Sequence, residues 1–318
     1  MLAIHRRAFI RSTPLALLMA RASLAQQAPI VLGTASQGGG FAIYALAFLD
    51  AMRAVDPALE IRTVATRGTM DNVPKLESGQ IDIGMVSGEV AHELFEGIGR
   101  PASKLKVLSV MFSTPGMFAV RADSRYRSID DLRGRPVVWN GKISGLAVQA
   151  RYMMEGLGLD LDKDFEPIYP DNLTDGPQMV IDGRAAALWG GGMRWPGFVE
   201  ISNSPRGARF VAPDAREIER IRAKFGFLTP ITVPAGLYPG QYDPIETLGS
   251  WSYLLARDGF PDVVGYRMAK DLFKIERAGS LSRQLADSTV KNTLIALPRA
   301  DLLQPGVLAY YREADLLK

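Results

Sequence analysis

The stretch LGTASQGGGFAIYALAFLDAM, residues Leu32 to Met52, predicts a strand, a glycine-rich loop and a helix in direct succession. The strand-like run stops at Gly33, and an apolar, helix-like run follows the three glycines. Such a loop presents bare backbone N–H groups at a helix N-terminus, which is a favourable place for an anion. The stretch therefore predicts an α/β fold with an anion site at the end of its first strand.

The rest of the chain continues this alternation. A strand (59–65), the loop TRGTMDN, a short helix ending at Gly79 and the strand IDIGMVS come next. A second unit, DDLRGRPVVWNGKISGLAVQARYMMEGLG, repeats the plan with a strand through Trp139, a glycine loop and a helix. Strands that alternate with helices predict parallel sheets with crossover helices. Two analogous α/β lobes are expected.

We expect a two-lobed α/β fold of the periplasmic binding protein kind, similar to type II. A long strand-like stretch follows each unit, so two extended segments would join the lobes as a hinge, with the strand–helix loops of both lobes facing a ligand cleft. Lobe I is predicted to comprise residues 26–118 and 240–318, and lobe II residues 119–239, each boundary within about ten residues.

Residues 1–25 have the features of an export signal. The segment HRRAFIR matches the twin-arginine pattern, and a short apolar stretch leads to the small-residue cleavage site Ser23-Leu24-Ala25. A basic amphipathic N-terminal helix is the alternative. No later segment reaches roughly 18 uncharged apolar residues, so we expect a periplasmic protein that is not embedded in the membrane.

Charge and composition exclude several function classes. The chain has 37 basic and 34 acidic residues, and without the four arginines of the signal 33 basic residues remain, a net charge of −1. A nucleic-acid partner would need a basic face. Cysteine is absent, and His92 is the one histidine beyond the signal. Common hydrolytic catalysis and a metal site are therefore disfavoured, and no cofactor is expected because the glycine loop lacks both nucleotide-binding patterns.

Five blocks of the chain resemble one known family. They are GTASQGGGF, TRGTMDNVPKLESGQIDIGMV, DDLRGRPVVWNGKISG, VPAGLYPGQ and QPGVLAYYRE, in this order along nearly the whole mature chain. They resemble the TAXI group of solute receptors, the periplasmic binding components of TRAP transporters. The resemblance implies a two-lobed receptor for amino acids, dicarboxylates or related small organic acids, which delivers its ligand to sodium-coupled membrane permease subunits.

The chain departs from the family pattern mainly in its ligand loops. The family usually has two tyrosines after the first glycines, a Thr-Gly-Gly-Ser loop, a glutamine after the next strand, Gly-Ser-Gly-Thr in lobe two and a late His-Pro-Gly-Ala. The corresponding residues here are Phe41-Ala42, Thr66-Arg67-Gly68-Thr69, Ser87, Ile143-Ser144-Gly145-Leu146 and Gln304-Pro305-Gly306-Val307. The resemblance therefore supports the receptor role more strongly than glutamate as the ligand.

The candidate ligand-binding residues lie in the loops between strands and helices. Each also has an ordinary structural alternative, such as capping a helix or packing a lobe. Arg67 is the sharpest candidate because a guanidinium pairs with a carboxylate in bidentate fashion; Arg194 is its rival, and tryptophans of lobe two would supply an apolar wall. The set is Ser36, Gly38, Gly39, Gly40, Phe41, Arg67, Gly68, Thr69, Asn72, Ser87, Trp139, Ser144, Gly145, Trp189 and Arg194.

The sequence thus predicts a monomeric periplasmic receptor that captures a small organic anion, a carboxylate or an amino acid, without chemistry. Hinge closure around the ligand would produce the form that the permease recognises. An ABC-type or sensor-linked receptor of the same shape is the alternative among binding proteins. The competing class is an exported enzyme, in which Asp and Glu pairs would supply all acid–base chemistry.

Overall fold

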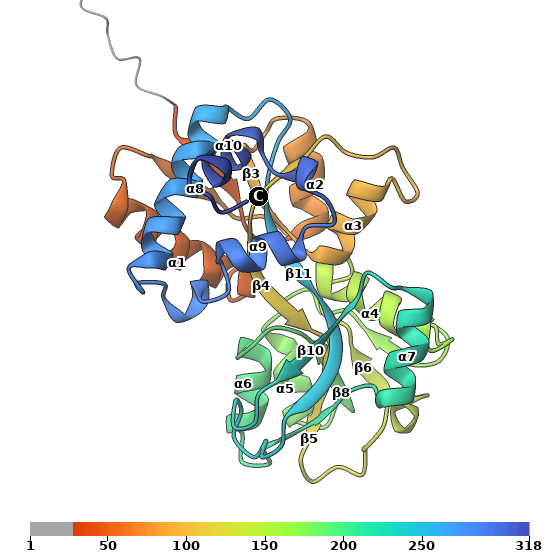
Figure 1. Ribbon diagram of the computed structural model, residues 1–318. Helices are drawn as coiled ribbons and strands as arrows, with labels where there is room; N and C mark the ends of the chain where they lie inside the picture. Colours follow the sequence, from red (N-terminus) through yellow and green to blue (C-terminus); the bar gives the residue numbers. More distant parts are fainter. Residues whose placement is uncertain (1–27, 318) are drawn as a thin grey trace, which may run out of the picture.

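A computed structural model describes residues 28–317, so the predicted signal peptide at 1–25 lies outside the described residues. The described chain forms two lobes, one above the other in Figure 1, joined by strands that run from one lobe into the other. This two-lobed arrangement of two mixed α/β sheets confirms the predicted fold class.

Eleven strands are present in the described chain. They are β1 (Ile30–Gly33), β2 (Ile61–Val64), β3 (Ile83–Val86), β4 (Lys106–Pro115), β5 (Met117–Arg121), β6 (Pro136–Val138), β7 (Glu166–Ile168), β8 (Ala187–Gly190), β9 (Ala208–Val211), β10 (Thr229–Val233) and β11 (Ile245–Ala256).

Ten α-helices and three 3-10 helices connect these strands in residues 28–317. The α-helices are α1 (Gly40–Val55), α2 (Thr69–Glu77), α3 (Gly88–Glu96), α4 (Gly145–Gly156), α5 (Asp175–Ile181), α6 (Pro196–Asn203), α7 (Ala215–Lys224), α8 (Asp262–Arg277), α9 (Val290–Ala296) and α10 (Pro305–Glu313). The 3-10 helices are η1 (Asp130–Leu132), η2 (Arg283–Leu285) and η3 (Ala300–Leu302).

The two sheets share one design. The first has the strand order β10-β11-β3-β1-β2, with β4 also paired to β11, and the second has the order β7-β6-β8-β5-β9. In each sheet one group of three strands is parallel and reaches an edge of the sheet, β2-β1-β3 in the first and β7-β6-β8 in the second. The carboxyl ends of parallel strands lie at one edge, where ligands bind in open α/β sheets. Each lobe therefore presents its strand–helix loops on one side.

The chain passes between the lobes at two adjacent points. β4 leads through Gly116 into β5, and β11 brings the chain back. The Gly116 N–H donates to the Leu248 carbonyl at 2.9 Å, and the Thr247 hydroxyl donates to the Gly116 carbonyl at 2.6 Å. Leu248 packs in the second-lobe core. The return therefore lies close to Gly249.

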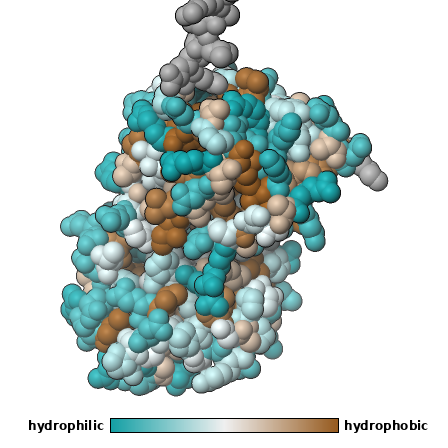
Figure 2. All heavy atoms as spheres, turned by 90° about the vertical axis from the view of Figure 1, so that its left-hand side faces the viewer, coloured by the Kyte–Doolittle hydropathy of each residue, from teal (hydrophilic) through white to brown (hydrophobic). Residues whose placement is uncertain are grey.

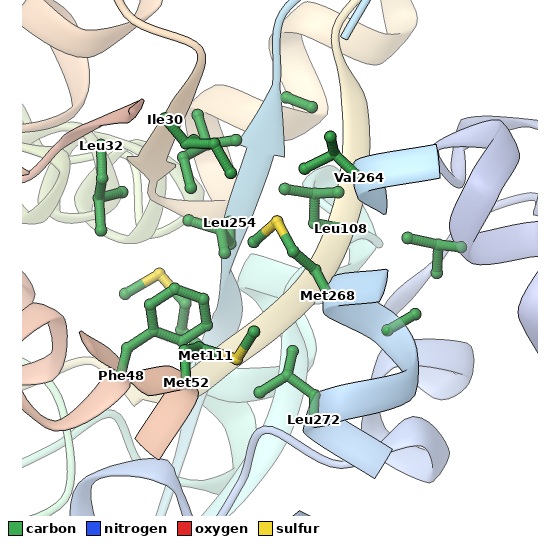
Figure 3. Packing of buried hydrophobic residues seen from close by; sticks show 14 of the residues in the cluster. Ile30, Leu32, Phe48, Met52, Leu108, Met111, Leu254, Val264, Met268 and Leu272 are labelled. Atoms are coloured by element: carbon green, nitrogen blue, oxygen red, sulfur yellow. The ribbon is translucent and has the colours of Figure 1, made fainter. Parts of the chain in front are cut away.

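The core of the first lobe forms where α1 and α8 cover its sheet (Figure 3). Phe48 and Met52 of α1 are four residues apart, so they lie on the same helix face. They face Leu254 of β11 and Met268 of α8. Fully burying one such side chain contributes about 1.5–3 kcal/mol relative to leaving it exposed, and this packing makes the lobe a rigid support for its loops.

Aromatic residues dominate the core of the second lobe. Trp139 and Trp189 are fully buried there, at the ends of β6 and β8. Phe118 meets Trp189 edge-on with ring centroids 4.8 Å apart, and Phe165 meets Trp139 in the same way at 5.2 Å. Edge-to-face contacts of this kind are the geometry that aromatic rings prefer.

Hydrophilic residues dominate the face of the molecule drawn in Figure 2, and hydrophobic residues occur there in small separate groups. Among the helices of residues 28–317, none combines the length and the apolar character needed to cross a membrane.

Candidate ligand-binding site

A cavity of about 140 Å³ lies between the lobes. Its walls come from the strand–helix loops of both lobes and from the strands that join them. The first lobe and its strands contribute Ala35, Ser36, Gly38–Phe41, Arg67–Thr69, Ser87, Glu89, Phe112, Thr114 and Ser252, and the second contributes Asn140, Ser144–Leu146, Leu173, Thr174, Pro177, Gly191, Trp195–Gly197 and Glu200.

Five helices of eight residues or more begin at this cavity, three from the first lobe and two from the second. The residues that precede α1, α2, α3, α4 and α6 all line it: they are Gly39, Gly68, Ser87, Ser144 and Trp195. The first N–H groups of a helix have no partner inside the helix, and the helix dipole places partial positive charge there. The sequence predicted only some of these ends, but the cavity brings all five together.

Side chains leave most of these helix ends uncapped. Only Ser144 caps its helix, accepting the Ala147 N–H at 3.2 Å; α1, α2, α3 and α6 have no side-chain cap. The Ser87 hydroxyl is buried and has no hydrogen-bond partner among the described residues. A buried polar group normally has a partner. The free N–H groups and this hydroxyl can be satisfied by a ligand with acceptor atoms.

Arg67 is the one cationic side chain that lines the cavity within residues 28–317. Its backbone N–H donates to Asp71 at 3.1 Å. Asp71 is paired in turn with Lys75 at 2.7 Å, and this hydrogen bond is the main reason that the pKa of Asp71 lies below its usual value. The Arg67 guanidinium forms no ion pair within the described chain. It is exposed at the rim, where it can meet an anion.

Glu89 lies at the floor of the cavity and is almost fully buried. The Ser250 hydroxyl donates to its Oε1 at 2.7 Å and the Gln149 amide at 3.0 Å. Gln149 also donates to the Thr114 carbonyl at 2.7 Å, which fixes the orientation of the amide. Burial raises the pKa of Glu89, and burial likewise raises the pKa of Glu200 in the second-lobe wall.

Apolar side chains line much of the remaining wall. Phe41 and Phe112 have ring centroids 6.1 Å apart, and a Cβ at Gly40 would lie 3.8 Å from Phe112 and 3.9 Å from Trp195. These three aromatic rings therefore gather around the start of α1. Leu146 and Leu173 line the cavity from the second lobe. A ligand held here has an apolar body as well as polar ends.

The lobes approach each other closely at Gly145, the first residue of α4. A Cβ at this position would lie 2.5 Å from both Cβ and Oγ of Ser87 and 3.1 Å from Oγ1 of Thr69. Real Cβ atoms do not approach other atoms to 2.5 Å, so a side chain here would push Ser87 away. The absence of a Cβ at Gly145 is what permits this approach of the second lobe to α2 and α3.

Comparison with known proteins places the chain in a family. The sequence profile of the NMT1-like family matches residues 32–314, which is nearly the whole described chain. The chain belongs to the NMT1-like family. The match includes all the loops that line the cavity.

Solved structures with the same fold are distant in sequence. A putative L-cystine ABC transporter protein from Listeria monocytogenes is 17% identical with a TM-score of 0.52, covering 87% of this chain and 98% of its own. The GluR0 ligand-binding core from Nostoc punctiforme in complex with L-glutamate is 11% identical with a TM-score of 0.51, and the match covers 81% of this chain and 98% of that one. An ancestral arginine-binding protein bound to arginine is 14% identical with a TM-score of 0.50, and the match covers 83% of this chain and 99% of that one. The fold is that of type II periplasmic binding proteins.

Eleven of the fifteen residues predicted from sequence line the cavity of this NMT1-like chain. The other four do not reach it. Trp139 and Trp189 point into the second-lobe core instead, because that lobe needs large apolar side chains behind its loops. The Asn72 amide donates to the carbonyls of Thr34 and Met85, both at 2.8 Å, and so ties the ends of β1 and β3 together. Arg194 is exposed outside the cavity.

Sequence reasoning missed several cavity residues of this family member. Glu89 stands two residues after Ser87, where an acidic residue is ordinary for the first turn of a helix. Phe112 lies within the long strand that joins the lobes, and nothing in an apolar strand marks the residue that faces a cleft. Trp195 was not in the candidate set, although it is one of the lobe-two tryptophans expected to form an apolar wall; it follows the loop GGGMR and precedes a proline that begins a helix.

Proposed function

We propose that this protein is a periplasmic receptor that captures a small organic anion between its lobes and transfers it to a membrane permease of the TRAP type. One observation carries the proposal: five helix N-termini from two lobes converge on one cavity, and four of them have no side-chain cap. The buried, unpartnered Ser87 hydroxyl in the same wall supports it independently. A carboxylate satisfies such groups with several charge-assisted hydrogen bonds.

Closure of the lobes provides the mechanism. Contacts between the lobes already hold them together: Gln149 donates to Glu89, Tyr152 donates to Glu93 at 2.8 Å, and the His92 and Phe227 rings stack 4.0 Å apart. A ligand that touches both lobes adds its own contacts to this closed arrangement only. It therefore shifts the equilibrium toward the closed form by its difference in affinity for the two forms.

The type of membrane permease that receives the ligand distinguishes a TRAP system from an ABC system. The five blocks that resemble TAXI receptors support a TRAP partner, whereas the fold is shared with a protein described as an ABC transporter component. Genes for large membrane permease subunits beside the gene for this protein would support TRAP. A neighbouring ATPase gene would support the ABC alternative.

A ligand screen by thermal unfolding tests the receptor proposal directly. A carboxylate at about a thousand times its dissociation constant adds roughly 4 kcal/mol of stability. For a protein of this size about 1 kcal/mol moves the unfolding midpoint by roughly 2–4 °C, so a true ligand at that concentration raises it by roughly 8–16 °C. A library in which sugars, cations or metals shift the midpoint and no carboxylate does so would refute the carboxylate proposal.

An exported enzyme on the same scaffold would have to use Glu89 and Glu200 as its acid–base pair. His92, the one histidine of residues 28–317, stacks on Phe227 and does not line the cavity. Recovery of chemically unchanged ligand after long incubation supports a receptor, whereas turnover of the ligand supports the enzyme.

A further inference from the structure

We infer that the cavity selects a monocarboxylate with an apolar body of about the size of one ring, that it discriminates against dicarboxylates, and that Glu89 is the residue that excludes the second carboxylate. The inference deepens the proposed function and rests on it. It is drawn from the charges, the floor and the apolar wall of the cavity.

The charges of the cavity suit one anionic group. Arg67 is the single cationic side chain in the described wall, and Glu89 and Glu200 are its two carboxylic side chains. A first carboxylate can use Arg67, the uncapped end of α2, which begins two residues after it, and the uncapped end of α1, which begins at the same cavity. A second carboxylate finds no second cation. A dianion would lose its hydration without an equal compensation.

Glu89 stands where a second carboxylate would have to bind. It lies in the first turn of α3, so its own carboxyl group occupies the positive end of that helix. Both of its side-chain donors, Ser250 and Gln149, reach Oε1, and no other side chain of the described chain donates to Oε2. In the ionised form of Glu89, Oε2 is therefore the atom that accepts a hydroxyl or ammonium group of a ligand and repels a carboxylate.

The neighbours of Glu89 do not supply a counter-charge. Gln149 comes from α4, Thr114 from β4 and Ser250 from β11, and none of these side chains is ionisable. The ionisable group that acts on it through charge, Glu93, has the same sign and raises the pKa of Glu89 further, although burial is the larger cause. A ligand donor would relieve this buried acceptor, whereas a ligand carboxylate would add to the repulsion.

The size and lining of the cavity limit the size and polarity of the part of the ligand beyond its carboxylate. An apolar cavity of roughly 150 Å³ holds a benzene molecule, and this cavity has about 140 Å³. Phe41, Phe112 and Trp195 supply aromatic surface, and Leu146 and Leu173 supply aliphatic surface opposite. A ring or a branched chain buries its surface against these residues, which a short, fully polar diacid cannot do.

Two pairs of probes that differ by one carboxylate test the inference. Benzoate is compared with terephthalate, and hexanoate with adipate, by calorimetric titration of the full mature protein. We expect the monocarboxylate of each pair to bind at least about tenfold more tightly, because opposed like charges in a desolvated site are strongly unfavourable. Monomethyl terephthalate keeps the length of terephthalate without its second charge, and we expect it to regain most of the lost affinity.

The variant Glu89→Gln tests the residue itself. A glutamine Oε1 can still accept from Ser250 and Gln149, so the contact between the lobes persists. We expect the ratio of the terephthalate affinity to the benzoate affinity to rise about tenfold. Glu200→Gln is the matched control, since it removes the other carboxylate of the same cavity.

Each outcome decides a distinct point. Dicarboxylates that bind the wild type as tightly as monocarboxylates overturn the inference but leave the receptor proposal in place. An unchanged ratio in Glu89→Gln, or an equal change in Glu200→Gln, removes Glu89 as the selecting residue. If neither terephthalate nor monomethyl terephthalate binds the wild type, the cavity excludes these probes by their length and not by their second charge, and the inference is overturned. If no carboxylate binds, the proposed function itself fails.

Discussion

Replacing Gly145 by alanine should weaken ligand binding without weakening the fold. The new Cβ would lie 2.5 Å from Cβ and Oγ of Ser87, whereas an ordinary contact between carbon atoms is about 3.5–4.0 Å. The second lobe must therefore retreat by about 1 Å at this point. Overpacking of this size costs roughly 1–3 kcal/mol. Since the lobes can separate about their hinge, the cost falls on the closed form and lowers affinity by a factor of about 5 to 150.

The assay is calorimetric titration with the tightest carboxylate from the ligand screen, accompanied by small-angle scattering to follow lobe separation. Gly141→Ala is the matched control, because a Cβ there meets only Leu173, at an ordinary 3.6 Å. Ser87→Gly removes both atoms that the new Cβ would meet at 2.5 Å, so in a Ser87→Gly background the step Gly145→Ala should cost much less affinity than it does in the wild-type background. Wild-type affinity in Gly145→Ala, or the same loss in both backgrounds, would refute the reasoning.

Four further outcomes are expected. Arg67→Ala should lose affinity for a carboxylate by about tenfold to a hundredfold, the value of a charge-assisted pair of roughly 1.5–3 kcal/mol, while Arg194→Ala, outside the cavity, should bind as the wild type does in the same titration. The folded-state pKa of Glu89 is raised by burial, so its contribution to stability is lost as the pH rises from about 4.3, the unfolded value, through the raised folded value. Denaturant unfolding should therefore show Glu89→Gln gaining stability relative to the wild type across that window, and a constant difference would contradict this. Ligand-induced change in tryptophan fluorescence should be lost in Trp195→Phe, because Trp189 is shielded in the core; a signal that persists unchanged would contradict this. Mass spectrometry should find the mature chain beginning near Gln26, and an intact Met1 on soluble cytoplasmic protein would exclude export.

The fold could be predicted because its signals are local. Each strand and helix of the parallel groups is a continuous run with its own apolar period and its own glycine punctuation, as in the stretch that begins at Leu32. The point at which the chain returns from the second lobe to the first has no such local signal. β11 is one long strand of which each half belongs to a different lobe, so its composition does not change where the core around it changes.

The candidate site could be predicted only where backbone position decides it. The first residues of a helix that follows a parallel strand reach the cleft whatever their side chains, and this accounts for Gly39, Gly68 and Ser144. The direction of a side chain is a different matter. Trp139 and Trp195 both stand in strand–helix loops of the second lobe, yet one fills the core and the other lines the cavity. Glu89 reaches the cavity because α4 and β11 pack around it, and no local sequence pattern predicts contacts between segments so far apart.

The single pair of crossings between the lobes also constrains the order in which the protein folds. The second lobe is one continuous segment, from Gly116 to about Gly249, and can collapse as soon as that segment is available. The first sheet cannot be completed then, because β11 must insert between β3 and β4, which precede it by more than a hundred residues. Such distant pairings form slowly. In the interval the edges of β3 and β4 are open, and β11 is the strand that covers both of them at once.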